Sequence, residues 1–281
     1  MVDRDAYHAQ SLEIWGEMAS GWQARHDWLV EVTGPVTEWI VTTADPQPGQ
    51  VWLDVAAGPG DLGFQLAERV GAEGRVLSTD FAPAMLDLAR GFGAARGLKN
   101  VEYRVLDAER MELADASVDG VACRFGYMLM ADPGAALRES HRVLRDGGTL
   151  TFAVWAPPDR NLWAALPAMT LVQRGHMPPP EPGGPGIFAL ADPARIGELV
   201  TGAGFDEPTV EEIAFDFRYS DFDDAWDALV RLAGPLARAV NILSDEERRA
   251  TRDAVQVSFE PYRRDGGSYV VPAAAWGVHA R

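Results

Sequence analysis

Short apolar runs alternate with helical patterns through the central part of this chain. The runs that have the length and composition of strands lie at 51–55, 75–79, 101–106, 117–125 and 149–155. The helical patterns between them lie at 62–70, 83–97 and 133–148. This alternation predicts right-handed βαβ units around a mostly parallel sheet that is buried on both faces. It constrains the fold more than any other feature of the sequence.

The pattern changes on both sides of this region. Residues 7–43 predict a helix that breaks at Gly34-Pro35, and an irregular segment follows the last central strand. The remaining expected elements are a helix at 192–203, a strand near 208–218, helical patterns at 221–265 and a final strand at 268–280. Together the elements predict an α/β fold: a Rossmann-like, seven-stranded, mostly parallel sheet with helices on both faces and an antiparallel last strand.

The expected domain organisation follows from these boundaries. Residues 1–45 form an N-terminal helical cap, and residues 46–281 form the main domain. This domain carries an irregular insertion at 156–190, which includes a run rich in proline and glycine, and a helical insertion at 220–266 before the last strand.

Charge and composition exclude several classes of partner. The 281 residues carry a formal net charge of −17, and the only lysine is Lys99. Nucleic acids and acidic membrane surfaces are bound mainly through Lys and Arg, so we expect neither as a partner. No apolar run reaches the ~18 residues of a membrane span, and the start of the chain does not resemble a signal peptide. We expect a bacterial, cytoplasmic protein with a small-molecule substrate, and a homodimer is compatible with the sequence.

A glycine-rich turn follows the first strand. From Gly58 the sequence reads G-P-G-D-L-G, and Asp80 lies twenty residues past Gly60. The spacing G-x-G-x-x-G with a later acid is typical of dinucleotide-binding folds. The turn alone does not distinguish between cofactors, because an acid at this position accepts ribose hydroxyls of any nucleoside.

Acidic residues follow three neighbouring strands and do distinguish between cofactors. Asp54, Asp80 and Asp107 stand at strand ends, where Arg124 is the only basic residue. A dinucleotide brings a pyrophosphate, which prefers helix N-terminal amides to carboxylates. S-adenosylmethionine has no phosphate, and its ammonium, sulfonium, ribose hydroxyls and adenine amine all suit acidic groups. The acids therefore favour S-adenosylmethionine over NAD.

The chain resembles the class I S-adenosylmethionine-dependent methyltransferases, and within them the bacterial group near the ubiquinone/menaquinone-biosynthesis methyltransferases. The matching stretches are LDVAAGPGDLG (53–63), STDFAPAMLDLAR (78–90), VEYRVLDAERMELADASVDGV (101–121) and ALRESHRVLRDGG (136–148). The resemblance implies an enzyme that transfers a methyl group from S-adenosyl-L-methionine and releases S-adenosyl-L-homocysteine, and it makes 46–281 the methyltransferase domain.

The resemblance also implies a set of cofactor-binding residues. Gly58 and Gly60 would contact the methionine part, Asp80 the ribose, and Asp107 the adenine edge. The whole set is Asp54, Ala57, Gly58, Gly60, Asp80, Phe81, Met85, Asp107, Ala108, Glu109, Arg124 and Phe125.

The sequence departs from the family pattern in three places, the third of which is a pair of residues. Ala56 replaces the usual first glycine, which is tolerable if its φ stays negative, and Ala82 replaces a helix-capping serine. Met128 and Leu129 stand where quinone-pathway members have an Arg-Asn pair, which argues against a quinone precursor as the substrate.

The acceptor site is expected to be apolar and aromatic. Its candidate lining residues are Trp15, Trp22, Tyr127, Met128 and Trp155. Methyl transfer needs a base only if the acceptor must lose a proton, so the catalytic residues stay unknown, with His8, His26 and His176 as weak candidates. No His-acid spacing indicates a metal. We expect methylation of a small, largely apolar or aromatic metabolite on O, N or C.

Two other functions fit parts of the pattern. A methyltransferase-like protein could bind the cofactor without transferring a methyl group, and the sequence does not separate this function from the first. An NAD(P)-dependent oxidoreductase would explain the glycine-rich turn, but the acids at 107 and 109 and the missing Tyr-x-x-x-Lys pair argue against it.

Overall fold

A seven-stranded sheet forms the centre of the structure, a computed structural model that describes residues 4–179 and 183–281. Its strands lie in the order β3-β2-β1-β4-β5-β7-β6. Their bounds are β1 Val51–Val55, β2 Arg75–Asp80, β3 Val101–Val105, β4 Val118–Arg124, β5 Leu144–Trp155, β6 Thr209–Tyr219 and β7 Tyr269–Ala280. The last strand runs antiparallel between β5 and β6, and all other neighbours are parallel. The predicted fold class is confirmed.

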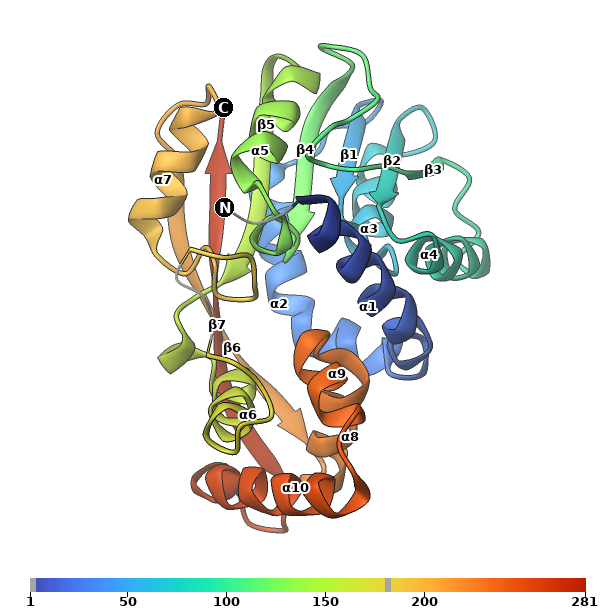
Figure 1. The fold of residues 1–281 in the computed structure, drawn as a ribbon. Helices are drawn as coiled ribbons and strands as arrows, with labels where there is room; N and C mark the ends of the chain where they lie inside the picture. The colour runs from blue at the N-terminus through green and yellow to red at the C-terminus, as the bar shows by residue number, and fades with distance from the viewer. Residues whose placement is uncertain (1–3, 180–182) are drawn as a thin grey trace.

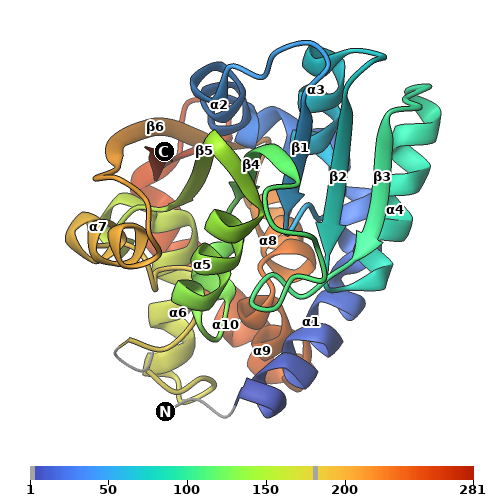
Figure 2. The same cartoon turned by 90° about the horizontal axis from the view of Figure 1, so that it is seen from above.

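Helices cover both faces of the sheet, as expected. Viewed from above, α2 and α3 lie on one face, and α5 and α7 lie on the other (Figure 2). The helices in this central region are α2 His26–Ala44, α3 Asp61–Val70, α4 Pro83–Ala95, α5 Pro133–Val143 and α7 Pro193–Gly202. Helix α5 ends earlier than predicted, because residues from Leu144 onward pair with β4 and Gly147 has a φ of +78°, which no helix accepts.

The N-terminal helix breaks at a different place from the one predicted. Helix α1 (Arg4–Ala24) and α2 meet at Arg25, whereas Pro35 lies inside α2. A proline inside a helix removes one hydrogen bond and clashes with the preceding turn. Helix α2 continues because a face that includes Val36 and Ile40 is fully buried against the sheet, and this burial outweighs the proline.

The insertions gather at one end of the sheet. Residues 156–190 are not irregular throughout, because α6 (Leu162–Gln173) lies within them; residues 180–182 of this insertion lie outside the described part of the chain. The helical insertion consists of α8 Phe222–Leu232, α9 Pro235–Asn241 and α10 Asp245–Phe259. Helices α6, α8, α9 and α10 lie beyond the ends of the central strands (Figure 1), and α1 packs against α4 and α8. None of the helices in the described residues is both long and apolar enough to span a bilayer.

Candidate functional site

A cavity of about 230 Å³ lies at the carboxyl ends of the central strands, beneath α1. Strand order reverses between β1 and β4, which is where open α/β sheets bind their ligands. Most of the residues that the resemblance assigned to the cofactor line it: Asp54, Ala57, Gly58, Asp80, Phe81, Met85, Asp107, Ala108, Glu109, Arg124 and Phe125. The sequence-based set therefore comes together in space with one exception.

That exception is Gly60, which is not among the residues that line the cavity. It precedes α3 with a φ of +93°, and a Cβ there would stand 2.6 Å from the Phe64 ring and 3.1 Å from Ala89. Its lack of a side chain lets the loop, α3 and α4 approach one another. Gly60 thus serves packing beneath the site rather than contact with the cavity.

Ala56 corrects a second expectation about this loop. Its φ is +52°, in the left-handed region that a side chain disfavours, and it lines the cavity. The alanine is therefore strained where the family pattern has glycine. The structure holds it there because the loop must turn sharply between the end of β1 and Gly58, whose φ is +53°.

Ala56→Gly is expected to raise the free energy of unfolding by about 0.5–1 kcal/mol, because relief of left-handed strain exceeds the extra freedom of the unfolded glycine. Urea denaturation measures the change. The matched control is Ala57→Gly, at a neighbour without positive φ, which should lower stability. A loss of stability in both variants would mean that the Ala56 methyl group contributes more by packing than its backbone costs.

Asp80 organises the loop as well as facing the cavity. Its Oδ2 accepts a hydrogen bond from the Gly58 N–H and its Oδ1 accepts one from the Ala82 N–H, both at 2.9 Å. The second bond fixes the backbone of Ala82 just before α4, a helix without a side-chain cap. Burial raises the pKa of Asp80, and these backbone donors oppose the shift.

Asp54 is the most deeply buried acid of the site, with 1% of its surface exposed. Among the residues that the structure describes, its Oδ2 has no hydrogen-bond partner, and a Cβ on Gly63 would lie 2.7 Å from this oxygen. Burial raises the pKa of Asp54 to about 8, while the positive charge of Arg124 opposes the shift. An unpartnered buried carboxyl group costs stability and is suited to a cationic ligand.

Arg124 is held in place by α2. Its Nη1 donates to the hydroxyl groups of Thr33 at 2.9 Å and Thr37 at 2.6 Å, and its Nη2 lies 3.7 Å from Asp61. Asp61 Oδ1 lies 2.9 Å from His26 Nε2, within hydrogen-bond distance. The His26 ring stacks on the Phe92 ring. His26 therefore has a structural place outside the cavity, which corrects its candidacy as a catalytic residue.

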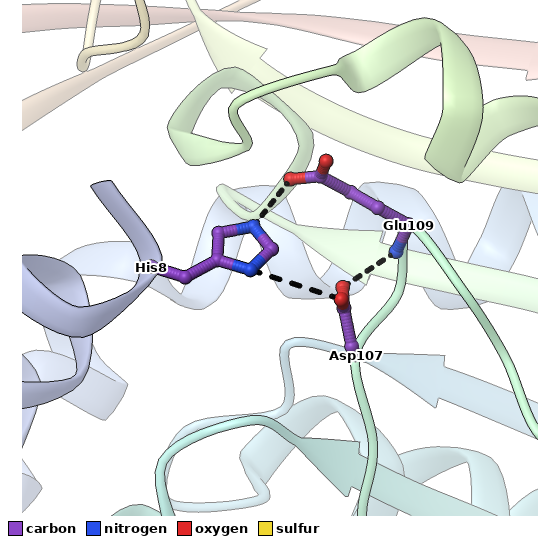
Figure 3. Close-up of side chains that lie close together, drawn as sticks. All are labelled: His8, Asp107 and Glu109. Atoms are coloured by element: carbon purple, nitrogen blue, oxygen red, sulfur yellow. Dashed lines mark hydrogen bonds and ion pairs between the residues drawn. The ribbon is translucent and has the colours of Figure 1, made fainter. Parts of the chain in front are cut away.

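His8 lies between two acids at the other end of the cavity (Figure 3). Its Nε2 is 3.1 Å from Glu109 Oε1, and its Nδ1 is 3.8 Å from Asp107 Oδ2. One histidine and two acids have the composition of a metal site. However, Arg4 lies 2.9 Å from Glu109 Oε2, and the Ala131 N–H donates to Oε1. Through these contacts the buried Glu109 links α1 to the loop after β3 and to the segment around Ala131.

The other half of the cavity is apolar and aromatic. Phe125, with a φ of +63°, stacks on Trp155 at 4.0 Å between ring centroids. The remaining lining residues of this half include Leu29, Met128, Trp163, Ile187, Phe217, Leu232, Ala233, Pro235 and Leu236. All titratable side chains that line the cavity come from α1 or from the ends of β1–β4. The apolar half thus offers no acid or base among the described residues.

The expected acceptor-site residues divide into two groups. Trp15, Trp22, Met128 and Trp155 line the cavity. Tyr127 is fully buried beneath it, where its hydroxyl pairs with Ser140 at 2.7 Å. His176 follows α6 and does not line the cavity either, so of the three histidine candidates only His8 does.

Sequence reasoning missed Tyr7, Thr33 and Trp163, which also line the cavity. The Tyr7 hydroxyl donates to the Leu129 carbonyl at 2.7 Å and fixes the start of α1. These three residues line the cavity because of the way α1, α2 and α6 pack on the sheet. No local sequence pattern predicts that packing.

Comparison with known proteins agrees with this geometry. The model of the ubiE/COQ5 methyltransferase family matches residues 36–161. This region of the chain is similar to the ubiE/COQ5 methyltransferases. It contains the glycine-rich loop and the acids at the ends of β1, β2 and β3, so the resemblance to class I S-adenosylmethionine-dependent methyltransferases is confirmed.

Curated relatives match about half of the chain or less. The demethylmenaquinone methyltransferase of Deinococcus radiodurans is 33% identical over 162 residues, which cover 54% of this chain and 66% of the relative. The ubiquinone/menaquinone biosynthesis C-methyltransferase of Xanthomonas oryzae is 42% identical over 111 residues, which cover 39% of this chain and 44% of the relative. The chain thus spans about half to two thirds of the length of the relatives it matches.

Solved structures share the fold over more of the chain. A putative methyltransferase from Bacillus halodurans has a TM-score of 0.58 and 21% identity, and covers 87% of this chain and 97% of its own. The [4+2]-cyclase SpnF has a TM-score of 0.57 and 19% identity, and covers 95% and 96%. Phosphoethanolamine N-methyltransferase 2 of Haemonchus contortus, in complex with S-adenosyl-L-methionine, has a TM-score of 0.53 and 17% identity, and covers 87% and 52%.

Proposed function

We propose that this protein transfers the methyl group of S-adenosyl-L-methionine to a small, largely apolar or aromatic molecule. The observation that carries the proposal is the division of one cavity into two halves. One half is lined by Asp54, Asp80 and Asp107, and the other by aromatic and aliphatic side chains. The acids suit a cationic nucleoside, and the apolar half suits the acceptor.

The acids match the groups of this cofactor one by one. Asp54, whose Oδ2 lacks a partner, would accept the ammonium group. Asp80 has further lone pairs for ribose hydroxyls beside the two backbone bonds that it accepts. Asp107 would accept the adenine amine, with Phe81 against the ring. A pyrophosphate would instead stand among three carboxylates, and Arg124 is already engaged by Thr33 and Thr37.

The chain contributes position and exclusion of water. When bound, S-adenosyl-L-methionine would supply an activated methyl group, and S-adenosyl-L-homocysteine would leave. The stacked rings of Phe125 and Trp155 form a wall of the acceptor half, and α1 covers the cavity. Alignment and exclusion of water are sufficient for an in-line transfer to an acceptor that is already nucleophilic. The absence of a base among the described residues of the apolar half favours such an acceptor.

The quinone substrates of the named relatives are not part of this proposal. Met128 and Leu129 line the cavity where the related pattern has an Arg-Asn pair, so polar recognition of a quinone precursor is missing there. We also propose no nucleic-acid or membrane partner, on the grounds of the net charge of −17, and a cytoplasmic location, which suits a chain whose single cysteine, Cys123, cannot form an internal disulfide.

Calorimetric titration with S-adenosyl-L-homocysteine and with NAD tests the cofactor. We expect S-adenosyl-L-homocysteine to bind and NAD to give no signal at the same concentration. Binding of NAD alone would overturn the proposal.

A second experiment tests the transfer itself. The protein is incubated with methyl-labelled S-adenosyl-L-methionine and a fractionated bacterial metabolite extract, and label is expected in an apolar fraction. Binding of the cofactor without any transfer of label would favour a protein that uses the fold for another purpose. The structural similarity to the cyclase SpnF extends over 95% of this chain, so the experiment must distinguish methyl transfer from cofactor binding alone.

A further inference from the structure

A second, smaller cavity lies behind the apolar half of the first. Its volume is about 30 Å³, and its walls come from α2, α6, β6, α8 and α10. The two cavities share four lining residues: Trp163, Phe217, Leu232 and Ala233. Only these side chains therefore need to separate an acceptor in the main cavity from the smaller space.

The walls of the second cavity are mostly apolar. The indole N–H of Trp28 donates to the Arg218 carbonyl at 3.0 Å, and that of Trp163 donates to Asn161 Oδ1 at 3.3 Å. The polar tips of these two tryptophans are thus occupied outside the cavity, and the other polar tips of the lining are those of Tyr219 and Trp226. Water needs two to four polar partners to stay in such a space, so this one is suited to hydrocarbon.

Small residues on one face of α8 create the space. Ala225 and Ala228 are both buried, and they face a cavity whose other walls include Phe217, Trp28 and Phe259. Larger residues at either position would fill it. All residues that line this cavity lie outside residues 36–161, so the second cavity belongs to the part of the chain that the family model does not match.

We propose that the second cavity is a binding subsite for a short aliphatic appendage of the methyl acceptor. The appendage enters between Trp163 and Phe217 on one side and Leu232 and Ala233 on the other. The inference rests on the proposed function, because it assumes that the acceptor's flat group occupies the apolar half of the main cavity. It adds that the acceptor is an alkyl-substituted flat molecule and that α8 selects the length of its substituent.

Binding of 4-methyl-, 4-ethyl-, 4-propyl- and 4-butylphenol tests the subsite. Quenching of tryptophan fluorescence reports binding, with S-adenosyl-L-homocysteine present at saturation. Affinity is expected to rise by up to about fourfold for each added carbon until the small cavity is full. A space of about 30 Å³ holds about one or two carbons, so in Ala228→Phe the affinity gained by the ethyl or propyl group should be lost, while binding of 4-methylphenol is unaffected. 4-(4-Hydroxyphenyl)butanoate, whose chain ends in a charge, should gain nothing over 4-methylphenol in the wild type.

The matched control is Val230→Phe, on the same helix but outside both cavities, which should keep the wild-type series. Thermal melting establishes that each variant is folded, and Ala225→Leu replaces Ala228→Phe if the latter is not. A wild-type affinity that does not rise with chain length, or a rise that persists in the filled variant, would overturn the inference. Failure of S-adenosyl-L-homocysteine to bind the wild type would instead count against the proposed function.

Discussion

Asp80→Ala is expected to weaken the binding of S-adenosyl-L-homocysteine at least tenfold. The carboxylate is nine-tenths buried, and hydrogen bonds to a charged group contribute roughly 1.5–3 kcal/mol each. A loss of 1.4 kcal/mol corresponds to about tenfold in the dissociation constant. Alanine also removes the acceptors for the Gly58 and Ala82 N–H groups, so the loop loses its fixed shape as well. Calorimetric titration measures the change.

Asp80→Asn separates the two contributions. One amide oxygen remains to accept a backbone N–H, but the negative charge and one acceptor are lost. We expect an affinity between those of the wild type and Asp80→Ala, and a higher melting temperature than that of the alanine variant. An unchanged dissociation constant in both variants would show that the ribose does not lie at the end of β2.

Asp54→Asn is expected to be more stable relative to the wild type at pH 8 than at pH 4, in the absence of ligand. Burial raises the pKa of Asp54 from 3.8 to about 8, so in this window the folded state keeps a proton that the unfolded state has lost. The contribution of Asp54 to stability therefore falls as pH rises from about 4 to about 8. Asparagine does not titrate, and one pKa unit corresponds to about 1.4 kcal/mol. We expect the variant to gain at least about 2 kcal/mol of unfolding free energy over the wild type between these pH values.

The same substitution should weaken the binding of the ligand. Loss of the carboxylate opposite the ammonium group is expected to reduce affinity for S-adenosyl-L-homocysteine about tenfold or more at pH 8. 5′-Methylthioadenosine, which lacks the amino acid part, provides the control and should bind both proteins equally. Equal losses for both ligands would mean that Asp54 supports the loop rather than the ammonium group. A stability difference that does not change with pH would mean that the carboxyl group is ionised throughout.

The sequence by itself determined the sheet and the acidic half of the site. Alternating strands and helices are local patterns, and the carboxyl ends of parallel strands must meet at one edge. Asp54, Asp80 and Asp107 could therefore be brought together without coordinates. The same reasoning led to Gly58 and Phe125, each next to the end of a strand.

Only the tertiary structure decided which groups the helices bring to that edge. Thr33 and Thr37 reach Arg124 across 91 and 87 residues of chain, and His8 reaches Glu109 across 101. His26 pairs with Asp61 rather than facing the cavity, and Ala56 takes a positive φ despite its side chain. Periodicity reports which face of an element is buried, but it does not report what that face meets. These contacts depend on how α1, α2 and the insertions pack on the sheet, and that packing is the sum of many weak interactions between residues far apart in the sequence.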